Sequence, residues 1–223
     1  MNENEEKVAL VDKRFIVTGL LVVFSVFFLG FFGQDNNTAV NPFFQTMLVS
    51  ITFFLVVPAL YSKIVLKESL KNLGWQRGRI FPGVFFSIVS VTLALGAVFL
   101  LTRYTSFAVE YHIPMLAQSQ FMLFLVYELV LVTFTTLLYE FFFRGLIQMS
   151  WLRSFGIWAI FLQTALFIGL LFLSDDISWQ RFPVIFFCPL AGIIAYYSKS
   201  IWYSWAASWI FLFLTDIFLL VIR

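Results

Sequence analysis

Charged residues are scarce in this chain. Lys, Arg, Asp and Glu make up 12% of its 223 residues, whereas an average soluble domain has about 25%. Hydrophobic residues make up 61%, phenylalanine alone occurs 31 times, and the mean hydropathy is +0.95. This composition excludes an ordinary soluble domain and predicts a polytopic protein whose main partner is the lipid bilayer. The basic residues lie in short loops between apolar runs, so we expect no nucleic-acid partner.

Cysteine and histidine occur once each, as Cys188 and His112. A single cysteine cannot form an intramolecular disulfide, and the apolar residues around Cys188 indicate a small buried side chain. A single histidine cannot build a histidine-rich metal site. His112 falls in a loop with Arg103 and Glu110, which favours a solvated residue. The sequence therefore predicts no metal and no cofactor.

Long apolar runs dominate the rest of the chain. They are continuous rather than alternating, and lipid does not tolerate unpaired backbone outside helices or closed barrels. About 20 helical residues cross the hydrocarbon of a bilayer. The predicted fold is therefore all-α, a polytopic transmembrane helix bundle with about seven spans. The runs are Phe15–Phe32, Phe43–Val65, Val84–Leu101, Phe121–Leu152, Ile157–Leu173, Phe182–Tyr197 and Ile201–Ile222.

Three of these runs are expected to be irregular. Pro58 predicts a kink in the second run. The fourth run is too long for one span, so we expect it to cross and then continue as an interfacial helix. The sixth is short and contains Pro189 and Gly192, which predicts a broken or tilted helix.

Lysine and arginine alternate between the two sides of the predicted membrane. The loop after the first run has neither residue, and the loop after the third has only Arg103. The positive-inside rule then predicts a cytoplasmic N-terminus and, with seven spans, an external C-terminus. One run that does not span would reverse the C-terminal side. The basic residues that set this orientation are Lys7, Lys13, Arg14, Lys63, Lys67, Lys71, Arg77 and Arg79.

The chain divides into three parts on this interpretation. Residues 1–14 form a cytoplasmic tail, residues 15–119 form N-terminal transmembrane helices and loops, and residues 120–223 form a membrane core. The polar segment Met1–Asp12 is expected to be loose.

Glu140 and Arg144 form an ionisable pair within the fourth run. Each charge costs about 2.5–3.5 kcal/mol near the bilayer centre, so such residues usually pair, face the protein interior and mark a site. Their four-residue spacing puts both side chains on one helix face, where they neutralise each other. The pair is therefore either a structural clamp for the fourth helix or part of a functional site.

The residues around this pair, Tyr-Glu-Phe-Phe-Phe-Arg-Gly at 139–145, resemble a family motif. The motif is Glu-Glu-x-x-x-Arg of the CPBP family, the CAAX proteases and bacteriocin-processing enzymes also called Abi proteins. Ala165–Phe172 resembles the second motif, Phe-x-x-x-His, and Cys188–Ser208, with its turn Lys199–Trp202, resembles the third. Leu66–Gly78 is similar to the loop before the family core. The resemblance implies a CPBP-like C-terminal core and a bacterial plasma membrane protein related to intramembrane proteases.

The chain departs from that family at its catalytic positions. Tyr139 stands where the family has its proposed general base, and only Glu140 and Arg144 match the first motif. The motif-three histidine, which holds the oxyanion, corresponds to Ser208, and the asparagine one turn later corresponds to Leu212. The motif-two histidine corresponds to Phe172, or to Leu171 if Phe167 is the anchor.

Three functions are compatible with these residues. The first is a pseudoprotease that binds another membrane protein, a lipidated peptide or a transmembrane helix. The second is a divergent intramembrane endopeptidase in which Arg144 releases Glu140 as a base and Tyr139 or Ser208 stabilises the oxyanion. The third is a small transporter or channel subunit, with a polar path lined by Glu128, Glu140 and Asp216.

Two further acidic residues fall in apolar runs. Glu128 precedes Tyr139 by eleven residues, about three α-helical turns, so the two should project from one face. It is either an interior site residue or a residue near the outer interface. Asp216 follows Ser208 by eight residues and shares roughly one side with it. It is either a functional residue or one that reaches the outer surface.

Overall fold

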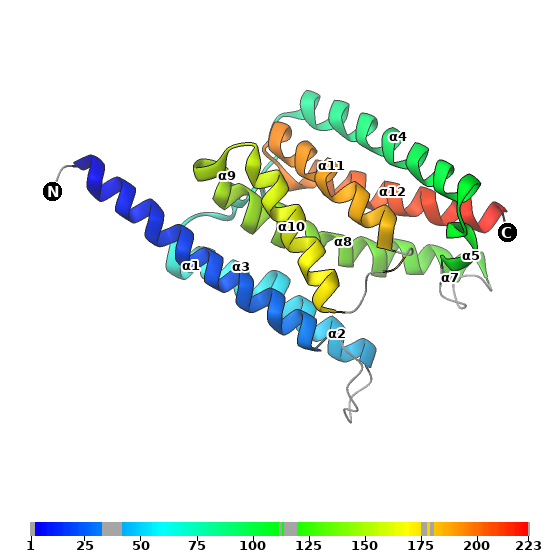
Figure 1. The fold of residues 1–223 in the computed structure, drawn as a ribbon, viewed down its shortest axis with the longest axis horizontal. Coiled ribbons are helices and arrows are strands. Elements are labelled where there is room, and N and C mark those ends of the chain that lie inside the picture. The colour runs from blue at the N-terminus through cyan, green and yellow to red at the C-terminus, as the bar shows by residue number, and fades with distance from the viewer. Residues whose placement is uncertain are drawn as a thin grey trace.

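Helices form all the regular structure in the described part of the chain (Figure 1). The computed structural model describes residues 3–32, 42–111, 113, 120–174, 178 and 181–222, without the side chains of 3–15, 32, 42 and 43. No strand occurs in these ranges, so the prediction of an all-α fold is confirmed. A helix satisfies its own backbone, which suits apolar surroundings. The predicted solvated histidine, His112, lies outside the described residues.

Four helical stretches are long and apolar enough to cross a membrane, and three apolar helices are shorter. Together they fall on the seven predicted runs, and they identify the chain as an integral membrane protein. Seven crossings and a cytoplasmic N-terminus stay predictions. The four long stretches are Phe44–Leu66, Ile80–Tyr104, Phe121–Phe155 and Ile201–Ile222, and the shorter ones are Ile16–Phe31, Trp158–Leu173 and Phe182–Ser198.

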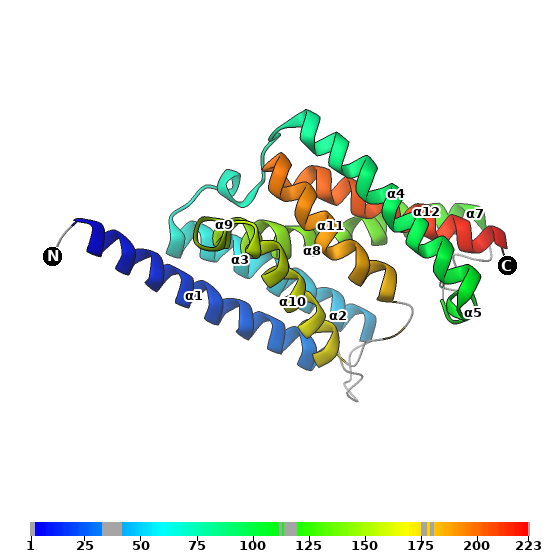
Figure 2. The ribbon, with the colours of Figure 1, turned by 45° about the horizontal axis from the view of Figure 1, so that its top comes forward.

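The helices are arranged in layers around the fourth apolar run (Figures 1 and 2). Helix α4 packs on α11 and α12 at one side, and α1 packs on α10 at the other. The segment η5 lies between these layers and contacts α10, α11, α12 and η1. In chain order the helices are α1 (Glu3–Phe32), α2 (Pro42–Ile51), η1 (Thr52–Val56), α3 (Val57–Tyr61), η2 (Ser62–Leu66), η3 (Leu70–Leu73), α4 (Ile80–Tyr104), α5 (Phe107–Glu110), α7 (Phe121–Val126), η4 (Tyr127–Val132), α8 (Thr133–Tyr139), η5 (Glu140–Met149), α9 (Ser150–Phe155), α10 (Trp158–Leu173), α11 (Phe182–Ser198) and α12 (Ile201–Ile222).

The N-terminal segment differs from the prediction. Helix α1 begins at Glu3, so the expectation of a loose tail over Met1–Asp12 is wrong from that residue onward. The segment is rich in Glu, Lys, Ala and Leu, which are among the strongest helix formers. It therefore continues the helix that the apolar run begins.

The second and fourth runs alternate between α- and π-helix. Pro58 lies in the first turn of α3, between the π-helical segments η1 and η2. The fourth run is continuous from Phe121 to Phe155 and is π-helical over η4 and η5. In η5 the residues from Glu140 to Gln148 are all buried. This segment is therefore the centre of the bundle, and π-helical segments are frequent at functional sites.

Helix α11 continues through Pro189 without a break, so the alternative of a broken sixth helix is wrong. Proline is tolerated in a membrane helix where neighbouring groups satisfy the backbone. Gly192 instead serves close packing, because a Cβ there would lie 2.8 Å from Cγ2 of Ile160 on α10.

The loop before α4 is bonded to the turn between α11 and α12. The Arg79 amide donates to the Ser198 carbonyl at 2.7 Å, and the Ser200 hydroxyl donates to the Gln76 carbonyl at 2.5 Å. The loop fits closely because Gly78 has a φ of +58° and no side chain. A Cβ at Gly78 would lie 2.2 Å from the Ser198 carbonyl oxygen.

We expect Gly78→Ala to destabilise the protein. The left-handed backbone alone costs a residue with a Cβ about 1–2 kcal/mol, and the clash with Ser198 adds to this cost. Thermal melting of the purified chain in detergent measures the loss. Gly96→Ala is the matched control, since a Cβ at Gly96 meets nothing within 4 Å. Equal melting temperatures for the two variants would contradict the close docking of the loop.

Candidate functional site

A buried ion pair lies in η5, at the centre of the bundle. Glu140 is 2% exposed and Arg144 is 4% exposed. Arg144 Nη1 lies 3.6 Å from Glu140 Oε1, so the predicted pairing is confirmed. Each of the two side chains has further hydrogen-bond partners, as a buried charge requires.

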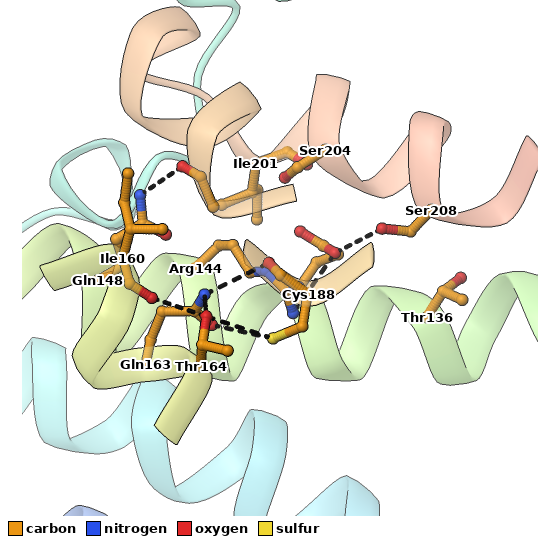
Figure 3. Close-up of polar contacts among 12 residues, drawn as sticks. Thr136, Arg144, Gln148, Ile160, Gln163, Thr164, Cys188, Ile201, Ser204 and Ser208 are labelled. Atoms are coloured by element: carbon orange, nitrogen blue, oxygen red, sulfur yellow. Dashed lines mark hydrogen bonds and ion pairs between the residues drawn. The ribbon is translucent and has the colours of Figure 1, made fainter. Parts of the chain in front are cut away.

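The partners of the ion pair come from two other helices (Figure 3). The Ser208 hydroxyl on α12 donates to Glu140 Oε1 at 2.7 Å. Arg144 Nη2 donates to the Cys188 carbonyl on α11 at 3.0 Å. The pair therefore holds three helices together. Ser208 was singled out only because it replaces a family histidine, and the structure brings it into direct contact with Glu140.

Two glutamines extend this polar cluster (Figure 3). Gln148 Nε2 donates to the Gly192 carbonyl at 2.8 Å. Gln163 Nε2 on α10 donates to the Thr164 hydroxyl at 2.9 Å and to the Cys188 carbonyl at 3.4 Å. Sequence reasoning missed both residues. Each is a neutral amide within an apolar run, and that isolation was the signal that could have found them.

Cys188 is 1% exposed, which confirms the prediction of a small buried side chain. Its thiol lies 3.6 Å from Gln163 Oε1.

A cavity of about 130 Å³ opens beside the ion pair. Its polar floor combines Glu140, Arg144 and Ser208 with the phenol-bearing Tyr139 and the hydroxyl of Thr136. Its walls are mainly apolar and come from α10, α11 and α12. The wall residues include Phe167, Leu171, Val184, Phe187, Phe211 and Leu212.

Two atoms at the floor of this cavity lack a hydrogen-bond partner within the described ranges. They are the acceptor Oε2 of Glu140 and the donor Nε of Arg144. Buried polar atoms are nearly always paired, so each unpaired one calls for an explanation. One of these atoms is an acceptor and the other a donor, so a ligand that supplies one group of each kind would complement them.

The other predicted positions divide into two groups. Tyr139 is half-buried and packs on Phe54 and Phe167, with ring centroids 4.8 Å and 5.8 Å apart. Leu171 is 5% exposed and lines the cavity, whereas Phe172 is 70% exposed and is not among the lining residues. The structure thus gathers Tyr139, Glu140, Arg144 and Ser208 and leaves Phe172 on the outer surface of the bundle.

These side chains do not form a typical set for amide hydrolysis. It requires a base for the attacking water, a donor for the oxyanion and an acid for the leaving amine. Glu140 Oε1 already accepts a hydrogen bond from Ser208 and faces Arg144. The lining contains hydroxyls but no imidazole. The cluster does offer charged and hydroxyl groups that can hold the polar part of a ligand.

A second buried acidic cluster lies apart from this cavity. The carboxyl groups of Glu128 and Asp216 lie close enough to interact electrostatically. The Tyr111 hydroxyl donates to Asp216 Oδ1 at 2.6 Å, and neither carboxylate oxygen of Glu128 has a hydrogen-bond partner among the described residues. Glu128 is 0% exposed and Asp216 is 5% exposed. Both carboxyl groups are therefore inside the bundle, and their depth in the membrane stays a prediction. They lie close together because α12 packs against η4.

The prediction that Glu128 and Tyr139 share one face is also wrong. Glu128 contacts Asp216 on α12, whereas Tyr139 stacks on Phe54 in η1 and on Phe167 in α10. The prediction used an α-helical period, but residues 127–132 are π-helical. A π-helix bonds to the fifth residue instead of the fourth, so it changes the angular register of the side chains.

We expect Arg144→Met to destabilise the protein by about 3–5 kcal/mol, because it leaves the Glu140 charge buried and unpaired. The double variant Glu140→Gln/Arg144→Met should cost less than the sum of the two single variants, since it removes both charges together. Unfolding free energies in mixed micelles measure this coupling.

Arg153→Met is the control for that cycle. It breaks an ion pair with Glu68 of 3.2 Å on the surface, where Arg153 is 69% exposed, and surface pairs contribute about 0–1 kcal/mol. Additive costs for Glu140 and Arg144 would contradict a coupled buried pair.

No family model, no curated protein and no solved structure matches the chain. What the cluster around Glu140 does is therefore inferred from its own chemistry.

Proposed function

We propose that this chain is a CPBP-like pseudoprotease, which binds a membrane-embedded peptide at Glu140 and Arg144 without cleaving it. The observation that carries this proposal is the pair of unpartnered buried atoms, Glu140 Oε2 and Arg144 Nε, at the floor of the cavity. A peptide group supplies one N–H donor and one carbonyl acceptor. A backbone unit of a partner therefore carries both kinds of group that these two atoms lack.

The walls of the cavity favour a partner from the bilayer. Phe167, Leu171 and Phe211 are among the apolar side chains that surround the polar floor. Apolar walls with a few placed polar groups are typical of ligand sites. A lipidated peptide or a transmembrane helix offers both components, an apolar body and a backbone amide.

Binding without cleavage follows from the replaced residues. Tyr139 and Ser208 stand where the resembled family has its base and one of its histidines, and Leu171 lines the cavity near the second histidine position. Oε1 of Glu140 is held by Ser208 and Arg144. The cations Arg144 and Arg181 and several hydroxyls line the cavity, but the two family histidine positions hold no imidazole. As part of this proposal, the protein lies in a bacterial plasma membrane with its N-terminus on the cytoplasmic side.

A binding assay on the reconstituted full chain tests the proposal. Nanodiscs holding the protein are titrated with a fluorescent lipidated peptide and, separately, with a labelled transmembrane peptide, and mass spectrometry monitors the peptides for cleavage. We expect binding of at least one probe and no cleavage of either. Leu171→Trp should fill the cavity and weaken binding at least about tenfold, because excess volume in a packed site forces side chains from their preferred positions.

Phe172→Trp is the matched control, because it adds the same side chain one residue away on the exposed surface. It should bind as the unaltered protein does. Equal affinity in both tryptophan variants would overturn the use of this cavity. Cleavage that disappears in Glu140→Gln would establish the alternative of an active divergent endopeptidase. Ion or solute flux into liposomes, with no peptide binding, would favour the transporter or channel alternative.

A further inference from the structure

A second cavity lies at the end of the bundle where the loop before α4 meets the turn between α11 and α12. Its volume is about 280 Å³, and it shares no lining residue with the cavity at Glu140. It is bordered by α1 through Thr18, by the loop through Glu68, Asn72 and Gln76, and by Lys199 in the turn. Residues from Met149 to Ser154, at the end of η5 and in α9, complete the border. It is therefore built from parts that are distant in sequence.

Lys199 occupies an unusual position on this border. Its φ is 57°, in the left-handed region where the residue after a helix is usually glycine or asparagine. The ammonium group lies 4.4 Å from the ring centroid of Tyr196, and no carboxylate among the described residues pairs with it. Partial burial, and then the nearby charge of Arg79, lower the pKa of Lys199. The side chain is a partly desolvated cation beside a second cation.

The other charges around the cavity leave this cation uncompensated. Glu68 is the one acidic residue that lines the cavity in the described part of the chain. It already accepts a hydrogen bond from Arg153 at 3.2 Å and another from Asn72 at 3.4 Å. Lys199 and Arg153 against Glu68 give the lining a formal charge of +1. The hydroxyls of Ser150 and Ser154 add neutral donors to the same border.

We infer that this cavity binds a phosphate-bearing anion, held by Lys199 and by the serine hydroxyls of residues 150 and 154. A phosphate group has several acceptor oxygens and matches donors that converge from different sides. Such an anion reaches the site either as the headgroup of an anionic lipid or as a free phosphate. Basic residues near a membrane surface attract anionic headgroups. The loop region that borders the cavity carries Lys67, Lys71, Arg77 and Arg79, and Lys63 lies just before it in η2.

Thermal shifts of the full chain in nanodiscs test this inference and identify the source of the anion. One arm compares phosphatidylcholine discs with discs that contain phosphatidylglycerol or phosphatidic acid. The other arm adds inorganic phosphate to the phosphatidylcholine discs, with chloride at equal ionic strength. We expect a phosphate-dependent rise in the melting temperature in at least one arm. A rise in the lipid arm identifies a lipid headgroup as the ligand. A rise in the phosphate arm identifies a soluble anion.

Lys199→Gln should weaken the binding of the anion about tenfold, since one charge-assisted contact is lost. Lys71→Gln is the control, because it removes one positive charge from an exposed residue of the same loop that does not line the cavity. The measured quantity is the shift caused by the anion, because Lys199 also lies at the C-terminal end of α11 and its removal changes the baseline stability. A shift that both variants lower equally would overturn the site in favour of general surface charge. A melting temperature that no phosphate compound changes would overturn it as well.

Discussion

A buried charge pair in an apolar bundle is the constraint on which the rest of this structure depends. Glu140 and Arg144 can stay ionised only if surrounding groups compensate them, and the chain supplies those groups from two other helices. The Ser208 hydroxyl and the Cys188 carbonyl serve as partners, and Gln148 and Gln163 satisfy neighbouring backbone on α11 and side chains on α10. The positions of α10, α11 and α12 are therefore set by polar contacts as much as by the packing of phenylalanine.

This arrangement also explains why polar chemistry and lipid-like walls meet in one place. The ion pair lies among the apolar faces of α10, α11 and α12, so its charges depend on the polar partners within the bundle. The same polar contacts leave one acceptor on Glu140 and one donor on Arg144 unused. The cavity at Lys199 has different surroundings. Lys199 is only partly buried, and the loop before α4 and the turn between α11 and α12 border it. The first cavity is complementary to a peptide group and the second to an anion.

The sequence alone was sufficient for the helices and for the pairing of Glu140 with Arg144. Continuous apolar runs imply helices, because lipid admits only helices and closed barrels and a barrel would require alternation, and a four-residue spacing implies contact. The proximity of Glu128 to Asp216 was out of reach, since it depends on which helices are neighbours. The sequence also could not decide whether Leu171 or Phe172 occupies the second histidine position of the resembled family. Adjacent residues on a helix point about 100° apart, so only the packing of α10 shows which one faces the cavity. Gln148 and Gln163 carry no charge, so their isolation within apolar runs was the one signal that could have pointed to them.

The π-helical form of η5 makes the length of this segment as consequential as its composition. Each hydrogen bond in a π-helix spans one residue more than in an α-helix, so the ten residues of η5 act like an α-helix that carries an insertion. A deletion of one residue there would let the segment relax to α-helix and rotate its two flanks by about 100° relative to each other. Gln148 and Trp151 would then turn away from their present neighbours while Tyr139 kept its own. Chains of this type should therefore tolerate exchanges of residues within η5 more readily than a change in its number of residues.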